Sequence, residues 1–318
     1  MKLSFKSALV TGGAGFIGSH LVEALISAGC RVAVLDNLST GSLTNLKRLK
    51  GEFSFFQDDI RNQKALSAAV EDCQVIFHLA AVVSVTQTVE NPIESAAVNE
   101  MGSLSVFETA REKGVQRVVF SSSCAVYGDD PRLPKLEDMA PKPLSPYAVQ
   151  KLAAEYYAQM FYDLHGLETT VLRYFNVYGP RQDPSSPYSG VISIFLTKAL
   201  LNEPAVIYGD GKQSRDFIFV QDVVRANLLA ATARGIGGRI INIGSGKSVA
   251  INQLWDEICA VSDRNLEPEY AAKRPGDIVA SLADAGRARE LLDFECETSF
   301  EAGLKSTFDW YRSQRSNT

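Results

Sequence analysis

The chain has 318 residues, of which 46% are hydrophobic and 22% charged, so it is long enough to bury one large core or two unequal ones. This composition excludes a disordered protein. Because the formal net charge is -5, the pI is near 5.4 and no dense run of Lys or Arg occurs, we expect neither nucleic acid nor a membrane as a partner.

The N-terminus, the cysteines and the histidines narrow the class of protein further. Residues 1–6 lead directly into a strand-like segment, and no apolar run reaches membrane-spanning length, so we expect a cytoplasmic protein. The five cysteines form no C-x-x-C pair and the three histidines match no metal-ligand spacing, which predicts no disulfide framework and no bound metal. These residues are Cys30, Cys73, Cys124, Cys259, Cys296, His20, His78 and His165.

Short aliphatic runs alternate with helix-length amphipathic segments through the first half of the chain. The pattern predicts βαβ units, and hence an α/β fold with a doubly wound parallel sheet that helices cover on both faces. Gly29, Gly114 and Gly166 stand where three helical patterns stop, as glycines at helix C-termini do. The runs that we expect to be strands are 8–10, 31–35, 75–79, 117–120 and 169–172, with a first helix over residues 16–28.

A glycine-rich turn, Thr11-Gly-Gly-Ala-Gly-Phe-Ile-Gly18, follows the first expected strand. It contains Gly13-x-Gly15-x-x-Gly18, a pattern that also occurs in tight turns that bind nothing. Its place between strand and helix favours a dinucleotide site, because glycines let the backbone approach a pyrophosphate that faces the helix N-terminus.

Asp36 ends the second expected strand, about twenty residues after the turn. A carboxylate at this place accepts the ribose hydroxyls of adenosine and repels a 2′-phosphate, which favours NAD over NADP. A helix-capping role is the alternative. The small polar residues of Asn37-Leu-Ser-Thr-Gly41 lie beside it, and Asp59-Ile60 follows the third strand, where we expect the adenine.

Tyr147 and Lys151 begin a helical stretch, and their spacing of four residues places both on one helix face. A tyrosine has an ordinary pKa near 10, so it acts as a base near neutrality only beside cations, here the Lys151 ammonium and a nicotinamide. A surface helix pair is the alternative. Tyr208 and Lys212 repeat the spacing, but in a glycine turn that gives no reason for parallel side chains.

The triplet Ser121-Ser-Ser123 follows the expected strand 117–120. Open α/β sheets bind ligands beyond the carboxyl ends of their strands, so Ser123 is expected to hydrogen-bond a reacting hydroxyl. A serine triplet by itself is also typical of a turn.

After about Phe175 the sequence changes to Gly/Pro/Ser-rich connections between isolated helices and short strands. We interpret this as a smaller α/β region that closes over the first. Because 217–220 and 239–242 look like further sheet strands, the regions are expected to interleave. The larger comprises residues 1–175 and about 214–246, and the smaller residues 176–213 and 247–318.

Seven segments taken together resemble an extended short-chain dehydrogenase/reductase, and within it the UDP-glucose/UDP-N-acetylglucosamine 4-epimerase group. The resemblance covers nearly the whole chain in order. It implies an NAD-binding Rossmann domain, a UDP-sugar-binding region, and 4-epimerisation of a UDP-hexose through a transient 4-keto intermediate. The segments are Thr11-Gly-Gly-Ala-Gly-Phe-Ile-Gly, Asp36-Asn-Leu-Ser-Thr-Gly, Phe77-His-Leu-Ala-Ala, Ser121-Ser-Ser-Cys-Ala-Val-Tyr-Gly, Ser145-Pro-Tyr-Ala-Val-Gln-Lys, Leu172-Arg-Tyr-Phe-Asn and Arg215-Asp-Phe.

The resemblance also implies three sets of site residues. The catalytic set is Tyr147, Lys151 and Ser123. The NAD-binding set is Gly12, Gly15, Phe16, Ile17, Gly18, Asp36, Asn37, Ser39, Thr40, Gly41, Asp59, Ile60, Leu79, Ala80, Ala81, Asn99, Ser121, Tyr147, Lys151, Tyr174 and Phe175. The UDP-sugar-binding set is Ser84, Ser122, Ser123, Asn176, Gly190, Val191, Val206, Tyr208, Arg215, Arg274, Asp277 and Ser281. Arg215 and Arg274 also suit a pyrophosphate, which favours guanidinium groups.

Two positions depart from related enzymes. Dehydratases and decarboxylases that resemble this chain carry an acidic residue after the serine or threonine run, whereas here Cys124 and Ala125 follow, which disfavours elimination. Enzymes restricted to UDP-glucose and UDP-galactose resemble one another in carrying a bulky tyrosine where this chain has Ser281. A small serine predicts a pocket with room for a 2-acetamido group or for a C6 carboxylate.

Other functions stay open. A UDP-glucuronate 4-epimerase would share every catalytic residue, and a nucleotide-sugar reductase would need NADPH, which Asp36 disfavours. A catalytically silent NAD-binding regulator would lack the Tyr147/Lys151 pair. The resemblance further suggests a homodimer formed by helices 99–112 and 147–164, with which the apolar side of Tyr156, Tyr157, Met160 and Phe161 is compatible, as it is with an internal core contact.

Overall fold

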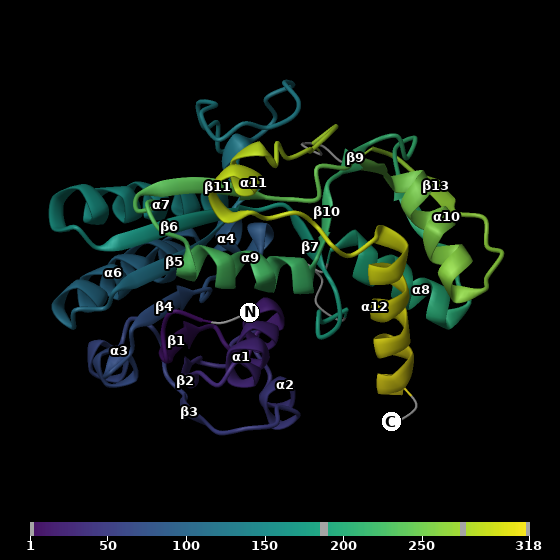
Figure 1. Ribbon diagram of the computed structural model, residues 1–318. Helices are drawn as coiled ribbons and strands as arrows, with labels where there is room; N and C mark the ends of the chain where they lie inside the picture. Colours follow the sequence, from purple (N-terminus) through teal and green to yellow (C-terminus); the bar gives the residue numbers. More distant parts are fainter. Residues whose placement is uncertain (1–2, 185–189, 274–277, 316–318) are drawn as a thin grey trace.

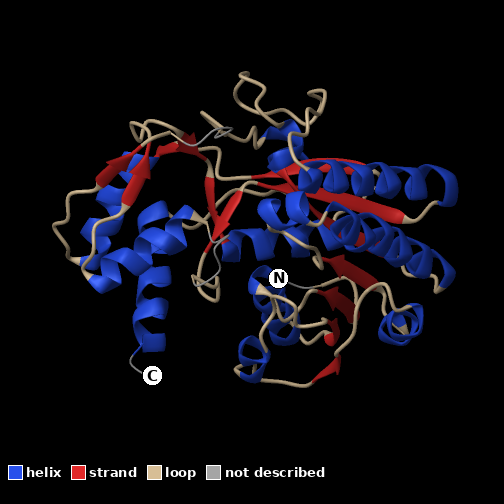
Figure 2. Cartoon of the chain, turned by 180° about the vertical axis from the view of Figure 1, so that it is seen from behind, coloured by secondary structure: helices blue, strands red, loops and turns tan. Residues whose placement is uncertain are grey.

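The computed structural model describes residues 3–184, 190–273 and 278–315. Seven parallel strands form its main sheet in the order β11-β6-β5-β4-β1-β2-β3, and helices cover both faces (Figures 1 and 2). This confirms the predicted doubly wound α/β fold. The strands are β1 (Ser7–Thr11), β2 (Arg31–Leu35), β3 (Phe53–Phe56), β4 (Val75–His78), β5 (Arg117–Ser123), β6 (Glu168–Tyr174) and β11 (Arg239–Ile243).

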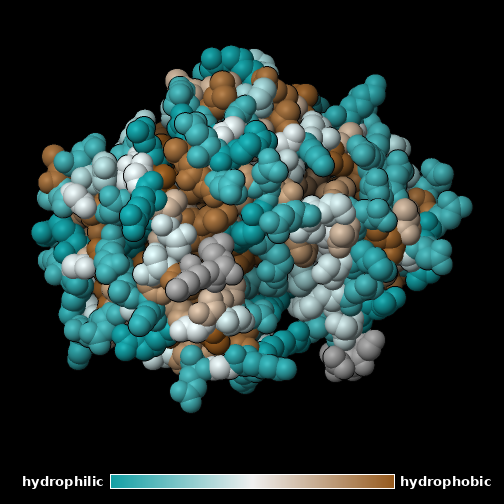
Figure 3. Space-filling view, in the orientation of Figure 1, coloured by the Kyte–Doolittle hydropathy of each residue, from teal (hydrophilic) through white to brown (hydrophobic). Residues whose placement is uncertain are grey.

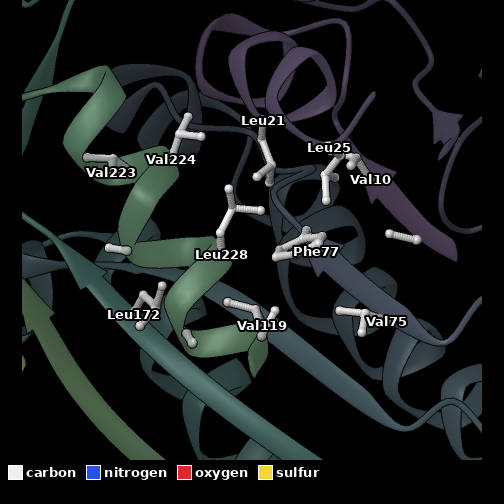
Figure 4. Close-up of a cluster of buried hydrophobic side chains, with 14 of the residues drawn as sticks. Val10, Leu21, Leu25, Val75, Phe77, Val119, Leu172, Val223, Val224 and Leu228 are labelled. Atoms are coloured by element: carbon white, nitrogen blue, oxygen red, sulfur yellow. The ribbon is translucent and has the colours of Figure 1, made fainter. Parts of the chain in front are cut away.

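Both faces of this sheet are buried because successive strand residues point to opposite sides and are apolar on both. Val10 packs with Leu21 and Leu228 in one core cluster, on the side of α1 and α9 (Figure 4). Leu9 packs with Phe107 in a second cluster under α3, α6 and α7. The helices are α1 (Phe16–Ser27), α3 (Gln63–Val70), α6 (Ser103–Glu112), α7 (Pro146–His165) and α9 (Val220–Thr232), with the shorter α2 (Leu43–Lys47), α4 (Val85–Glu90), α5 (Pro92–Ala96) and a π-helix, η1 (Ala97–Gly102).

The three predicted helix-ending glycines lie where the sequence placed them. Gly29, Gly114 and Gly166 have φ angles of 76°, 67° and 67° and follow α1, α6 and α7. Glycine adopts this left-handed conformation without steric cost, so each helix stops and the chain turns into the next strand.

A smaller region lies beside the sheet and has its own core. Phe195, Trp255 and Phe308 belong to one buried cluster between α8, α10 and α12 (Figure 1). Its elements are β7 (Asn176–Tyr178), α8 (Val191–Leu201), β8 (Val206–Tyr208), β9 (Ser214–Arg215), β10 (Phe217–Phe219), β12 (Val249–Ala250), α10 (Ile251–Ser262), β13 (Glu269–Ala271) and α12 (Phe300–Arg315).

Two details differ from the expected division of the chain. Segment 217–220 supplies β10, but β10 pairs with β7 in a two-stranded ribbon, and Val220 already begins α9. Helix α11 (Gly286–Leu292) packs through Ala288 and Leu292 on the core of the sheet, although its sequence range was assigned to the smaller region. The interleaving is therefore closer than the sequence indicates.

The surface of the view in Figure 3 is mostly hydrophilic, because the large apolar side chains of these clusters are inside. Within residues 3–184, 190–273 and 278–315, none of the helices combines the length and apolar character that crossing a membrane requires.

Two buried histidines are neutral near pH 7. In His78, Nδ1 lies 2.8 Å from the Thr11 hydroxyl and Nε2 lies 2.9 Å from the Ser103 hydroxyl, which itself donates to the Asn99 carbonyl. This chain of bonds assigns the ring proton to Nε2. Burial lowers the pKa of His78 to about 3 and that of His20 to about 4.

These histidines predict a loss of stability in acid. Because both folded pKa values lie below the ordinary value of 6.5, the unfolded chain takes up protons first as the pH falls below 6.5. Between pH 7 and pH 5 each group should remove about 2 kcal/mol from the free energy of unfolding. In denaturant unfolding at these two pH values, His20→Gln should lose about 2 kcal/mol less than the wild type, while the same change at exposed His165 serves as the control. Equal losses in all three proteins would contradict this account.

Candidate active site

The strand order of the main sheet reverses between β1 and β4. In open α/β sheets a ligand binds at such a switch point, beyond the carboxyl ends of the strands. The glycine turn after β1, the segment after β4 and the serines at the end of β5 all lie at this edge.

The glycine turn is closely packed and leaves a helix N-terminus open. Gly12 has a φ of +70°, and a Cβ on Gly18 would lie 2.1 Å from the Gly12 carbonyl oxygen. Gly15 is the N-cap of α1 and supplies no side-chain acceptor, so backbone N–H groups of the first turn have no capping partner. A diphosphate fits this arrangement, since it can accept from those N–H groups.

Asp36 stands at the end of β2, as predicted, and holds the turn in place. Its Oδ2 accepts from Ala14 N at 2.9 Å and its Oδ1 from Leu38 N at 2.8 Å. Burial raises the pKa of this carboxyl and the two backbone bonds oppose the rise. Each oxygen keeps a further lone pair, so the carboxylate can still accept a ribose hydroxyl.

Helix α7 brings the predicted catalytic side chains together. Ser145 caps its N-terminus by accepting from Ala148 N at 3.2 Å, and Pro146 occupies its first turn. The Ser123 side chain lies close enough to the Tyr147 phenol to act on its pKa. The Lys151 Nζ lies 5.9 Å from the centre of the Tyr147 ring and donates to the Ser121 carbonyl at 2.9 Å.

The smaller region brings Ser281 to the same place. The Ser281 N–H donates to the Ser214 carbonyl at 3.1 Å, and its side chain lies close enough to the thiol of Cys124, the residue after Ser123, to act on the pKa of that thiol. Burial raises the pKa of the Cys124 thiol to about 11, so the group opposite the serine is a neutral thiol, not an acid. Ser281 therefore lies beside the carboxyl end of β5, where Ser121 to Ser123 stand.

Comparison with known proteins identifies the family. The description "NAD dependent epimerase/dehydratase family" belongs to the family model that matches residues 8–244. The chain belongs to this epimerase/dehydratase family. A UDP-glucose 4-epimerase from Mycolicibacterium smegmatis is 39% identical over 310 residues, which are 96% of this chain and 98% of the relative.

Two solved structures are similar to this family member over nearly their whole length. The UDP-glucose 4-epimerase from Thermotoga maritima, solved with UDP-glucose, has a TM-score of 0.92 at 40% identity and covers 97% of this chain, which covers 99% of it. The UDP-N-acetylglucosamine 4-epimerase from Methanobrevibacter ruminantium, in complex with UDP-N-acetylmuramic acid, has a TM-score of 0.94 at 41% identity, with coverage of 99% and 100%. The cofactor of the family is NAD, as the sequence predicted.

The electrostatics of the catalytic pair follow from its burial. Burial raises the pKa of Tyr147 to about 12, and the nearby Ser123 side chain opposes this. Burial lowers the pKa of Lys151 to about 8, and the negative charge of Glu155 opposes that shift. In this epimerase/dehydratase family member a pKa of about 12 keeps the phenol protonated at pH 7, and a cation placed beside it would favour the phenolate.

Several predicted site residues use their polar atoms within the protein. Ser121 lies 2.9 Å from the Tyr174 hydroxyl, which is also bonded to Asn227. The Asn99 amide joins the backbone of Val82 to the Gln150 side chain. The side chains of Ser121, Tyr174 and Asn99 thus hydrogen-bond to other protein groups.

Ser122 is a correction to the predicted UDP-sugar set. Its hydroxyl donates to Glu155 Oε1 at 2.5 Å, within the buried face under α7. Successive strand residues alternate between the faces of a sheet, so Ser122 points away from the side that Ser121 and Ser123 share. We therefore leave it out of the proposed substrate site.

The remaining predicted residues, whose roles stay predictions, make the following contacts. Ser84 caps α4 by accepting from Gln87 N, and Asp59 pairs with Arg61 at 2.9 Å. Ile60 and Phe175 are buried core residues. The others stand at the glycine turn, in the 37–41 and 79–81 loops, at the starts of α8 and β7, at the two ends of β8, or, for Arg215, at the end of β9. Arg274 and Asp277 lie outside the described residues.

Sequence reasoning missed a buried ion pair behind the catalytic helix. Glu155 accepts from Arg173 at 2.9 Å and 2.6 Å, and the two side chains are 0% and 2% exposed. Arg173 also lies 4.8 Å from the centre of the Tyr127 ring. A signal was present, because Glu155 stands four and eight residues after Lys151 and Tyr147 in an otherwise apolar helix face.

Proposed function

We propose that this chain is an NAD-dependent 4-epimerase of UDP-hexoses that accepts UDP-N-acetylglucosamine and UDP-N-acetylgalactosamine as well as UDP-glucose and UDP-galactose. The observation that carries the proposal is that α7 brings Tyr147 and Lys151 to the serines at the end of β5, where the Lys151 Nζ lies 5.9 Å from the centre of the Tyr147 ring and donates to the Ser121 carbonyl at 2.9 Å. The similar solved epimerases support the class of reaction.

The residues divide the work as follows. The chemistry that NAD supplies when bound is reversible hydride acceptance. The open N-terminus of α1 would hold its pyrophosphate and Asp36 its adenosine ribose. Tyr147 takes the proton of the sugar 4-hydroxyl and later returns it, Ser123 orients that hydroxyl, and the Lys151 ammonium favours the phenolate.

The sugar nucleotide would be held from the smaller region. Arg215 suits the diphosphate, and Asn176, Tyr208 and the N-terminus of α8 at Gly190 suit the rest of UDP. The 4-keto sugar must turn over between the two hydride transfers, so the pocket needs space beyond a single bound pose. The small Ser281 side chain provides that space where a tyrosine would fill it.

The test is direct incubation of the purified protein, without added cofactor, with UDP-N-acetylglucosamine, UDP-glucose and UDP-glucuronate separately. Chromatography then resolves the 4-epimers. The proposal expects UDP-N-acetylglucosamine to be converted at least as readily as UDP-glucose. Conversion of UDP-glucuronate alone would favour the uronate epimerase, and no conversion even with NAD supplied would leave only a reductase or an NAD-binding regulator.

Replacing Ser281 tests the substrate range. Ser281→Tyr should lower kcat/KM for UDP-N-acetylglucosamine by about 10- to 200-fold and change that for UDP-glucose by less than about threefold, because a phenol ring occupies the space of the acetamido group. Ser281→Ala keeps a small side chain at this position and should retain activity with both UDP-N-acetylglucosamine and UDP-glucose. If Ser281→Tyr leaves the ratio of the two activities unchanged, the serine does not set the range.

We also propose a homodimer. Exposed apolar residues line one side of α7 at intervals of seven, four and four: Val149, Tyr156, Met160 and Leu164. Met101 of the neighbouring helix pair is 58% exposed. Of the four residues named from the sequence, Phe161 is buried in the sheet core and Tyr157 packs against it. Light scattering should give twice the chain mass of 34.6 kDa.

A further inference from the structure

Asp216 is a fully buried carboxylate between β9 and β10, and the proposed reaction does not use it directly. Its Oδ1 accepts from the backbone N–H and the hydroxyl of Ser245, both at 2.7 Å. Its Oδ2 accepts from the N–H groups of Gly246 and Ala283, both at 3.0 Å. Four neutral donors among the described residues therefore converge on one side chain.

The donors come from chain segments that are far apart in the sequence. Ser245 and Gly246 follow β11 of the main sheet, whereas Ala283 lies two residues after Ser281. The backbone carbonyl of Asp216 also accepts from the N–H and the side-chain amide of Asn176, at 3.0 Å and 3.1 Å. The side chain and the carbonyl together join the large region to the small one.

Three of the joined segments carry a residue of the proposed UDP-sugar site, and the fourth, Ser245–Gly246, belongs to the large region. Arg215 directly precedes Asp216, Asn176 is bonded to its carbonyl, and Ser281 is tied twice, through Ala283 and through its own bond to the Ser214 carbonyl. Ser281 in turn contacts Cys124 beside the catalytic Ser123. The Asp216 carboxylate thus ties the segment of Ser281 to the loop after β11, while its backbone carbonyl holds Asn176.

There is little room for this group to shift. A Cβ on Gly244 would lie 2.8 Å from Asp216 Oδ2, so the backbone passes directly against the carboxylate. An asparagine would turn an NH2 group toward two N–H or O–H donors, which leaves those donors without an acceptor.

We propose that Asp216 is a positioning residue for the UDP-sugar: it holds Arg215, Asn176 and Ser281 in one arrangement facing the catalytic end of β5. This inference rests on the proposed function. A purely structural role would instead lower stability and leave substrate affinity unchanged.

Asp222 offers a matched control. It is also a buried aspartate, 3% exposed, and accepts from two backbone N–H groups, those of Glu297 and Thr298, at 3.0 Å and 3.3 Å. Neither partner belongs to the proposed site. Asp222→Asn should therefore lower the melting temperature without changing KM.

The experiment compares Asp216→Asn, Asp222→Asn and the wild type. Calorimetry gives the Kd of UDP, kinetics with UDP-N-acetylglucosamine gives KM and kcat, and the absorbance of released nucleotide gives the NAD content. Asp216→Asn should raise both the Kd of UDP and the KM by about tenfold or more. It should keep its NAD and change kcat by less than about threefold, because the lost contacts bind the substrate and the transition state equally.

If Asp216→Asn does not fold, a second variant tests whether Asp216 positions the UDP-sugar contacts. Ser245→Ala removes one of the four bonds and leaves the carboxylate, so it should raise KM in the same direction by about two- to fivefold. Variants that lose stability but keep KM and the Kd of UDP within about twofold of the wild type would overturn the inference. A wild-type protein that neither binds UDP nor converts any UDP-sugar would overturn the proposed function itself.

Discussion

Tyr147→Phe is expected to lower kcat for epimerisation by about 10²- to 10⁴-fold, the contribution typical of a positioned acid or base. The change removes only the phenolic oxygen, which lies near the Ser123 side chain. Lys151 stays in place, because its own partner is the Ser121 carbonyl at 2.9 Å. Cys124 does not replace that oxygen as a base, because its thiol is neutral.

The measurement is single-turnover conversion of UDP-N-acetylglucosamine, together with the NAD content and the Kd of UDP. Both binding quantities should equal those of the wild type. Tyr162→Phe, on the same helix but packed against Gly237 and Gly238, is the control and should keep full activity. A Tyr147→Phe enzyme with more than about a tenth of wild-type kcat would show that another group moves the proton.

Glu155→Gln is expected to cost about 3–5 kcal/mol of unfolding free energy, the loss typical when one partner of a buried ion pair is removed. Arg173 is 2% exposed and donates two hydrogen bonds to Glu155, so the change leaves its guanidinium buried without a counter-charge. The Ser122 hydroxyl donates to the same carboxylate. The pair joins α7 to β6, so the loss also loosens the helix that carries Tyr147 and Lys151.

Chemical denaturation of the NAD-bound protein measures this loss. Glu168→Gln is the matched control, because Glu168 pairs with Arg117 at 3.0 Å on the same strand as Arg173 but is 37% exposed. A half-exposed pair contributes about 0–1 kcal/mol, so this variant should remain close to the wild type. Equal losses in the two variants would mean that the buried pair contributes no more than the outer one.

The sequence alone determined the features that depend on local geometry. The glycine turn, the three helix-ending glycines and the Tyr147/Lys151 spacing were all readable, because φ preferences and the period of a helix act within a few residues. The alternating apolar runs gave the parallel sheet for the same reason. Even the error at Ser122 was avoidable, since the period of a strand sends it to the other face from Ser123.

Only the tertiary structure decided how distant segments meet. Arg173 and Glu155 are 18 residues apart, and Asp216 and Ala283 are 67 apart, yet each pair shares a buried hydrogen bond. The contact of Ser281 with Cys124 and the pairing of β10 with β7 are of the same kind. A buried polar group must find partners wherever packing brings them, and no local pattern records which segments packing will join. The sequence therefore predicted the candidate reacting residues. The buried contacts that hold these residues in position could be found only in the tertiary structure.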